Sequence, residues 1–271
     1  MSGENLIFDI GMHRGEDTDF YLKKGFRVIG VEANPVLSEY CVRRFQNECQ
    51  TGQLVVVSKA VAEHGGTVDF YVNRKFSIWG TADTDWMLRN RKLGAESDLI
   101  QVPSVRMDDL FGQYGIPYYM KVDIEGLDHL CISTLVGRAE KPSYVSVETH
   151  AWSGAETLKL LTLLSAAGYT RFKIVSQIGV ASQTCPYPAR EGAYVDARFP
   201  ADASGLFAKE LLGIWLTLAE AKSQFRRIYR IIRILGPHRG VLRNFKSYDA
   251  VAALARRFPA ADDWFDLHAM L

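Results

Sequence analysis

Polar side chains that could bind a ligand or transfer protons follow several short apolar segments in this sequence. Asp9 lies within the first apolar run, and Gly11 and Gly15 bracket the loop that comes after it. Glu32 follows the next apolar run, 21 residues after Gly11. A carboxylate at such a strand end can accept hydrogen bonds from both hydroxyls of an adenosine ribose. The spacing therefore predicts a nucleotide site near the start of the chain.

Charged residues in this loop and in the helix after it indicate which nucleotide derivative fits. A dinucleotide fingerprint that begins at Gly11 needs glycine where this chain has His13 and Glu16. Glu16, Asp17 and Asp19 fall in the first helical turn, where they would repel a pyrophosphate. An adenosine with a zwitterionic, sulfonium-bearing tail suits this pattern, so we expect S-adenosylmethionine (SAM) as cofactor. The alternative is a βαβ unit whose glycines serve only turn geometry.

The first 175 residues alternate between apolar strands and helices, which is typical of a doubly wound α/β sheet. Ligands of such sheets bind beyond the carboxyl ends of the strands. Residues expected at those ends are Asp9, Glu32, Ala60, Asp123 and His150. We predict a Rossmann-like SAM-binding core over residues 1–175. Residues 176–271 are expected to form a C-terminal loop and helical extension that packs on the core and contributes to substrate binding.

Three segments have a less regular pattern. Residues 76–91 are rich in aromatic side chains and are predicted to form a loop. Residues 176–213 are rich in Gly, Pro, Ala and Ser, which favours a long active-site loop or a lid. Residues 218–235 are predicted to form an amphipathic helix with Arg226, Arg227, Arg230 and Arg233 on one face.

Composition limits the class of protein. A chain of 271 residues with 48% hydrophobic content can bury a full core, and its net charge of +1 gives no general attraction to nucleic acid. Its four cysteines are widely spaced, without a metal-binding pattern, as in reduced cytoplasmic proteins. The start of the sequence lacks a signal-peptide pattern, and we expect no membrane span. These features predict a cytoplasmic protein with a small-molecule substrate and indicate no oligomeric state.

Two parts of the sequence resemble motifs of the FkbM family of SAM-dependent methyltransferases. They are DIGMHRGEDT with VIGVEANP, and YYMKVDIEGLDHLCISTL, where the usual family forms are close to DIGANIGNTS, VIAFEPNP and LKIDVEGAE. The likeness covers residues 5–175, and WFDLHA near the C-terminus is similar to a segment of some members. His13, Arg14 and Ala33 depart from the usual pattern. The first two are expected to alter how the methionine end of the cofactor is held.

The resemblance implies a class I methyltransferase fold and a set of cofactor contacts. The implied contacts are Asp9, Gly11, Gly15, Glu32, Asn34, Ala60, Val61 and Asp123, and His13 lies in the same loop. Glycines let the backbone approach the methionine end, and Glu32 is expected to take the ribose. The Asn34 side chain has two alternatives, which are to orient adenine or to cap the following helix.

The candidate catalytic residues are Asp123, Glu125 and His150. Methyl transfer depends on alignment and exclusion of water, and a hydroxyl acceptor also needs a base. Asp123 is expected near the transferable methyl group. Glu148 shares a strand face with His150 and could orient it, although Glu148 could equally pair with Lys121. Asp123, Glu125 and His150 offer ligands of the type that magnesium prefers, but their spacing is not diagnostic, and no metal is predicted.

Together these features predict O-methylation of a hydroxyl on a glycoside, a polyketide or another secondary metabolite. N-methylation is one alternative, and a nicotinamide-dependent oxidoreductase is another. A third alternative is a non-catalytic SAM-fold module that binds a partner through the segment 222–246, which has eight basic residues and no acidic ones. A solvated face of a packed helix is the commoner explanation of such a segment.

Overall fold

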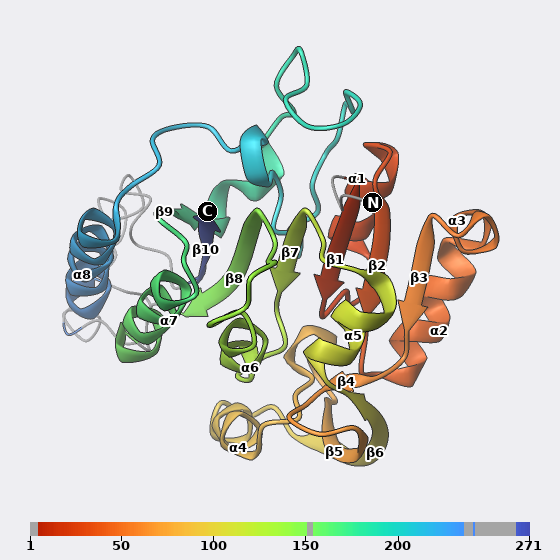
Figure 1. Cartoon of the computed structure of the whole chain (residues 1–271). Helices are drawn as coiled ribbons and strands as arrows, with labels where there is room; N and C mark the ends of the chain where they lie inside the picture. Colours follow the sequence, from red (N-terminus) through yellow and green to blue (C-terminus); the bar gives the residue numbers. More distant parts are fainter. Residues whose placement is uncertain (1–4, 151–153, 236–240, 242–263) are drawn as a thin grey trace.

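The computed structural model describes residues 5–150, 154–235, 241 and 264–271, with only the backbone of His150 and Leu235. These residues form a seven-stranded sheet and a separate three-stranded sheet (Figure 1). The large sheet contains β1 (Leu6–Ile10), β2 (Arg27–Val31), β3 (Leu54–Val57), β7 (Tyr119–Val122), β8 (Tyr144–His150), β9 (Arg171–Ser176) and β10 (Trp264–Met270). Every residue of β1 and β7 is buried, as expected for strands that are covered on both faces.

The strands of the large sheet follow the order β3-β2-β1-β7-β8-β10-β9. From β1 the chain adds β2 and β3 on one side and then β7 and β8 on the other, so the order of the strands reverses between β1 and β7. Neighbouring strands run parallel, except that β10 is antiparallel to β8 and β9. Ile10 pairs with Val31 on one side and with Val122 on the other, so three strands end side by side. Ligands of open α/β sheets bind at such a position. The predicted Rossmann-like, doubly wound fold is confirmed.

Successive residues of β1 point to opposite faces of the sheet and join different apolar cores. Phe8 stacks on Phe111 with the ring centroids 5.8 Å apart, whereas Ile7 belongs to a cluster that contains Tyr21. The helices around the sheet are α1 (Glu16–Lys23), α2 (Pro35–Arg44), α3 (Gln46–Thr51), α5 (Met107–Tyr114), α6 (Asp128–Ser133), α7 (Gly154–Ala166) and α8 (Leu218–Leu235). Burial on both faces holds the strand ends in fixed positions.

The smaller sheet supplies a segment that the sequence did not predict correctly. Its strands are β4 (Ala60–Val61), β6 (Ser97–Val105) and β5 (Gly66–Asn73), in that order. Between β5 and β6 the chain forms the short 3-10 helix η1 (Ser77–Trp79) and α4 (Thr84–Lys92). The prediction of a loop over residues 76–91 was therefore wrong. Local capping starts α4, because the Asp83 side chain accepts a hydrogen bond from Trp86 N at 2.9 Å.

The segment after β9 is anchored to α1 of the core. It contains the 3-10 helices η2 (Gln177–Ser182) and η3 (Ala208–Glu210). Lys24 Nζ lies 2.6 Å from Glu210 Oε1, and both side chains are fully buried. Ser204 N donates to Asp17 Oδ1 at 2.9 Å. Residues of this segment are thus packed against the core. The sequence had predicted either a long active-site loop or a lid here and did not decide between them.

Strand β10 lies inside the large sheet, whereas the sequence suggested a loop and helical extension after residue 175. It pairs with β8 from Trp264 to Met270 and with β9 from Phe265 to Met270. Its pattern is hard to recognise because the polar residues Asp266 and His268 are buried along with the apolar ones. Residue 175 is therefore not a boundary of the sheet.

Helix α8 presents an apolar face to the core and a basic face to solvent. Phe225, Ile228 and Ile232 are buried, whereas Arg226, Arg227, Arg230 and Arg233 are exposed. This arrangement fits a solvated helix face, although residues 236–240 and 242–246 of the basic segment lie outside the described residues. Within the described part of the chain, no helix combines the length and apolar character needed to cross a bilayer.

Candidate active site

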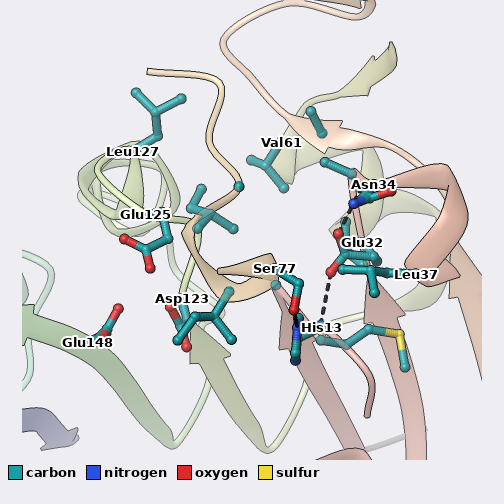
Figure 2. A pocket seen from close by; sticks show the side chains of 18 of the residues that line it. His13, Glu32, Asn34, Leu37, Val61, Ser77, Asp123, Glu125, Leu127 and Glu148 are labelled. Atoms are coloured by element: carbon teal, nitrogen blue, oxygen red, sulfur yellow. Dashed lines mark hydrogen bonds between the residues drawn. The ribbon is translucent and has the colours of Figure 1, made fainter. Parts of the chain in front are cut away.

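A cavity lies at the ends of β1, β2 and β7, where the order of the sheet predicts a ligand site (Figure 2). Its lining comes from the loop after β1, the end of β2, the start of α2, β4, η1 and the loop between β7 and α6. Glu32 and Asn34 lie at one end in Figure 2, and Glu125 and Glu148 lie at the other. His13 and Ser77 lie between these two ends.

Gly11 brings the backbones of three strands close together. Its φ is 85°, and a Cβ at this position would lie 1.8 Å from the carbonyl oxygen of Asp123. Gly11 N also donates to Val31 O at 2.9 Å. Any other residue would therefore push β1 away from β7. Gly15 has a packing role, because a Cβ there would lie 2.4 Å from the Phe45 ring.

Backbone donors hold the carboxylate of Glu32 at the end of β2. His13 N donates to Oε2 at 2.9 Å, and Asn34 N donates to Oε1 at 2.8 Å. Burial raises the pKa of Glu32 to about 7, and these two hydrogen bonds oppose the shift. A carboxylate has about four acceptor positions, so each oxygen can accept a further donor such as a ribose hydroxyl. The Asn34 side chain accepts from Val36 N at 3.0 Å, which is the helix cap that was one of its two predicted roles.

Ser77 and Ile78 line the cavity beside His13. Nε2 of His13 lies 2.9 Å from Ser77 Oγ, and its Nδ1 lies 3.2 Å from Glu16 Oε1. The cavity volume is about 90 Å³. Ligand sites commonly enclose roughly 300–1,000 Å³. A nucleoside-sized ligand therefore requires side chains of the lining to move.

Three carboxylates converge at the opposite end of the cavity (Figure 2). Asp123, Glu125 and Glu148 each place an oxygen within 4.8 Å of the others. Burial and the charge of Asp123 raise the pKa of Glu125 to about 8. Burial, Asp123 and Glu125 raise the pKa of Glu148 well above its usual range. Crowded carboxylates favour uptake of a proton, and a metal ion or another cation could relieve the same repulsion.

Glu125 is fixed by residues from the segment between β5 and β6 of the smaller sheet. Trp86 Nε1 donates to Glu125 Oε2 at 2.5 Å, and Thr81 Oγ1 donates to the Glu125 carbonyl oxygen at 2.7 Å. The φ of Glu125 is 52°, in the left-handed region that residues with side chains seldom adopt. Strain of this kind persists where the surroundings impose it, and it is common at functional sites.

Lys121 provides a buried positive charge between the two ends of the site. Its Nζ lies 3.2 Å from Asp123 Oδ2, 3.5 Å from Asp17 Oδ2 and 3.8 Å from Asp9 Oδ1. Burial alone would lower the pKa of Lys121, but these carboxylates raise it well above its usual range. The sequence had suggested Glu148 as a partner of Lys121, whereas the structure pairs Lys121 with these three aspartates.

Most of the predicted cofactor residues line the cavity. Those in its lining are Gly11, His13, Glu32, Asn34, Ala60, Val61 and Asp123. Asp9 and Gly15 lie behind it in the described part of the chain, and Asp9 accepts a hydrogen bond from Thr18 Oγ1 at 2.6 Å. The catalytic candidates Asp123 and Glu125 also line it. The side chain of His150 lies outside the described residues, and its backbone pairs with Trp264 of the lining.

Sequence reasoning did not place several residues of the cavity. Ser77 and Asp202 belong to segments without apolar periodicity, so no pattern indicated their position. Glu148 was expected beside His150 or Lys121, and its convergence with Asp123 and Glu125 was not predicted. Its signal is a charged side chain inside an otherwise apolar and hydroxyl-bearing strand.

The donors and charges of the lining fit SAM. Acidic residues in the lining are Glu16, Asp17, Glu32, Asp123, Glu125, Glu148 and Asp202, against the lysines Lys59 and Lys121. Such a lining favours the sulfonium and ammonium groups of SAM and disfavours a pyrophosphate. Gly11 leaves the backbone open to close approach, and Glu32 offers acceptors to a ribose.

Comparison with known families decides which class of protein this is. The model of the family described as Methyltransferase FkbM domain matches residues 9–171. The chain belongs to the FkbM methyltransferase family. It is a SAM-dependent methyltransferase, and the match spans the glycine loop, Glu32 and the three converging carboxylates. The predicted family, enzyme class and cofactor are thus confirmed, and so is the class I type of fold.

The solved structures that match this FkbM methyltransferase share little sequence identity with it. A SAM-dependent methyltransferase from Archaeoglobus fulgidus has 14% identity and a TM-score of 0.39, covering 99% of this chain and 87% of that one. One from Thiobacillus denitrificans, in complex with S-adenosyl-L-homocysteine, has 8% identity and a TM-score of 0.37, covering 100% and 86%. Because both TM-scores are below 0.5, the fold assignment rests on the strand order. A search of curated proteins gave no match.

Proposed function

We propose that this FkbM methyltransferase transfers the methyl group of SAM to a hydroxyl oxygen of a small molecule. The observation that carries this proposal is the convergence of Asp123, Glu125 and Glu148 at one end of the cavity. A hydroxyl loses its proton when it is methylated, and a positioned carboxylate can accept that proton. A base works best when its pKa is close to the working pH, and the pKa of Glu125 is raised to about 8 by burial and by Asp123.

The cofactor would lie with its ribose at Glu32 and its adenine beside Asn34, Ala60 and Val61. Its methionine end would reach Gly11, where the backbone is open to close approach. Bound in this way, SAM supplies an electrophilic methyl group. The chain contributes the remaining requirements, because Glu32 positions the ribose and the Ser77–Ile78 segment excludes water from the cavity.

The acceptor is proposed to be a glycoside, a polyketide or another secondary metabolite, and the enzyme is proposed to act in the cytoplasm. Residues 176–271 are proposed to take part in substrate binding. Asp202 and Trp264 support this role, because both line the cavity although they lie outside the predicted core of residues 1–175.

Ligand titration and a labelling experiment test this function. Isothermal titration should show binding of S-adenosylhomocysteine (SAH) and little binding of NADH. Incubation with SAM that carries a deuterated methyl group, and with panels of hydroxyl and amine acceptors, should place the label on oxygen in products analysed by NMR. A folded protein that fails to bind SAH would contradict the cofactor placement. Label found solely on nitrogen would replace O-methylation with N-methylation.

Two variants separate positioning from proton transfer. Asp123→Asn should weaken SAM binding and reduce turnover together, because Asp123 is proposed to lie beside the methyl group. His150→Ala should leave SAH affinity nearly unchanged and reduce turnover on the order of 10²–10⁴-fold if His150 is the base. Full turnover in the His150 variant would assign the base to the carboxylates, and Glu125→Gln should then carry the loss.

A further inference from the structure

A second cavity lies beside the cofactor cavity, on the other side of Glu148. Its walls are α4 with the residue that precedes it, the start of α6 with the residue two before it, the end of β8 and much of α7. Its volume is about 990 Å³, which is large enough for a drug-sized ligand. Among the described residues, Glu148 alone belongs to the linings of both cavities. A molecule in the second cavity can therefore contact Glu148, one of the three converging carboxylates.

Much of the wall of this second cavity is apolar. Leu158, Leu160 and Leu163 of α7 contribute to it and are only partly buried. Trp86 contributes from α4, and its hydrogen bond to Glu125 Oε2 at 2.5 Å holds the indole in place. One side of this indole is taken by Arg89, whose guanidinium lies 4.7 Å from the ring. A fixed aromatic ring opposite a leucine wall suits an apolar molecular body.

Acidic side chains outnumber basic ones among the described residues of this second lining. Its carboxyl groups include those of Asp83, Asp85, Asp128 and Glu156, whereas Lys159 and His129 are basic. Glu148 also lines the cavity, but its raised pKa keeps a proton on this carboxyl to higher pH. Hydrogen bonds from Trp86 N to Asp83 and from Ile124 N to Asp128 hold two of these groups in position. Asp85 and Glu156 are exposed and come from different walls, α4 and α7. A ligand at the rim therefore meets negative charge from two sides.

We propose that the second cavity binds the methyl acceptor, and that the acceptor is a hydroxyl-bearing molecule with an apolar body and a positively charged group, such as a protonated amine. The inference rests on the proposed hydroxyl methylation. The leucines and Trp86 bury the body, and the cation faces the rim carboxylates. The hydroxyl then lies at Glu148, where the two cavities meet. An acceptor with a carboxylate in place of the amine would be repelled by the same groups.

Matched phenols test the charge preference with the full chain saturated with SAH. The probes are tyramine, which is cationic, 3-(4-hydroxyphenyl)propionate, which is anionic, and 4-ethylphenol, which is neutral. Tyramine should bind at least tenfold more tightly than the propionate in isothermal titration. Raising the salt concentration to about 0.5 M should reduce that ratio, because ionic strength screens the rim charges. Equal affinities for the two charged probes would overturn the proposal.

Paired variants locate the preference in this cavity. The double variant Asp85→Asn, Glu156→Gln should reduce tyramine affinity several-fold and leave 4-ethylphenol affinity unchanged. Asp69→Asn, at an exposed position of β5 outside both cavities, should change neither. An equal effect of Asp69→Asn would also overturn the proposal. SAH affinity is measured in the same samples, so failure of the cofactor site is distinguished from failure of the acceptor site.

Discussion

At the Glu32 end of the cofactor cavity, two backbone N–H groups hold one carboxylate, whereas at the Glu148 end three carboxylates face one another. The first end is built from a continuous stretch of chain. The second end combines residues after β7, a residue of β8 and Trp86 from the segment between β5 and β6. Both ends raise a carboxyl pKa by burial. Repulsion from a neighbouring carboxylate is a minor cause for Glu32, whereas it is the second-largest cause for Glu125 and Glu148.

This difference separates a binding region from a region that can change its protonation. Hydrogen-bond donors oppose the rise in the pKa of Glu32 and favour its ionised form. Asp123 acts in the opposite direction on Glu125 and Glu148, so protons are retained there to higher pH. We therefore expect substitutions at the first end to change cofactor affinity most, and substitutions at the second end to change pH dependence most.

The largest effect is expected at Gly11, on which both ends depend. Gly11→Val should reduce SAH affinity by more than 100-fold, because its Cβ would lie 1.8 Å from the Asp123 carbonyl oxygen and its φ is 85°. Isothermal titration measures the loss, and circular dichroism shows whether the fold survives. Gly25→Val is the matched control, since Gly25 has a φ of 90° but no neighbouring atom within 4 Å of its Cβ position. Equal losses in both variants would mean that backbone strain, and not the close approach, is responsible.

Glu32→Ala should weaken SAH binding by about 1.5–3 kcal/mol, because hydrogen bonds to a charged group are lost. The backbone donors His13 N and Asn34 N would also lose their acceptor. Titration calorimetry at pH 8 provides the measurement. Glu39→Ala, at an exposed position of α2, serves as the control and should leave affinity unchanged. Unchanged affinity in the Glu32 variant would place the ribose elsewhere.

The carboxylate end should make the ligand-free protein less stable as pH rises. A carboxyl with a higher pKa in the folded chain binds more protons when folded, so the free energy of unfolding falls between its ordinary and its raised pKa. For Glu125 this window runs from 4.5 to about 8. Glu125→Gln should reduce the fall in unfolding free energy over this range by roughly 1–3 kcal/mol. Melting temperatures measured across the range should then decline less steeply in the variant. An identical pH profile for the variant and the parent protein would show that Glu125 is not perturbed in this way.

The smallest effect concerns the contact between Ser77 and His13, which lie between the two ends of the cavity. Ser77→Ala removes the partner of His13 Nε2 and should increase the dissociation rate of SAH about two- to tenfold. Stopped-flow tryptophan fluorescence can follow the release. Ser133→Ala, at an exposed position of α6, removes a comparable hydroxyl far from this contact and should leave the rate unchanged. A Ser77 variant with the parent rate would mean that this hydrogen bond does not control opening.

The difference between the two ends also explains what the sequence could predict. Gly11 and Glu32 belong to one strand, loop, helix and strand unit, so their positions follow from local pattern. Ser77 lines the cofactor cavity and Trp86 contacts Glu125. Both belong to the segment between β5 and β6, whose pairing depends on contacts between distant parts of the chain. Helix α4 was missed because an Asp83 cap, and not an apolar repeat, marks its start. The shared position of Glu148 depends on how α6 and α7 pack beside β8, which no local pattern encodes.

Strand β10 sets an order for the assembly of this molecule. Residues 264–270 must insert between β8 and β9, and Asp266 then lies in register with Glu148. While a ribosome is still producing the chain, β1, β2, β3 and β7 can already associate, since they pair without β10. Contacts between distant segments form late, because a long loop must close first. A nascent chain can therefore pair the strands that precede Gly11 and end beside Glu32 well before β8, which carries Glu148, gains its second neighbour.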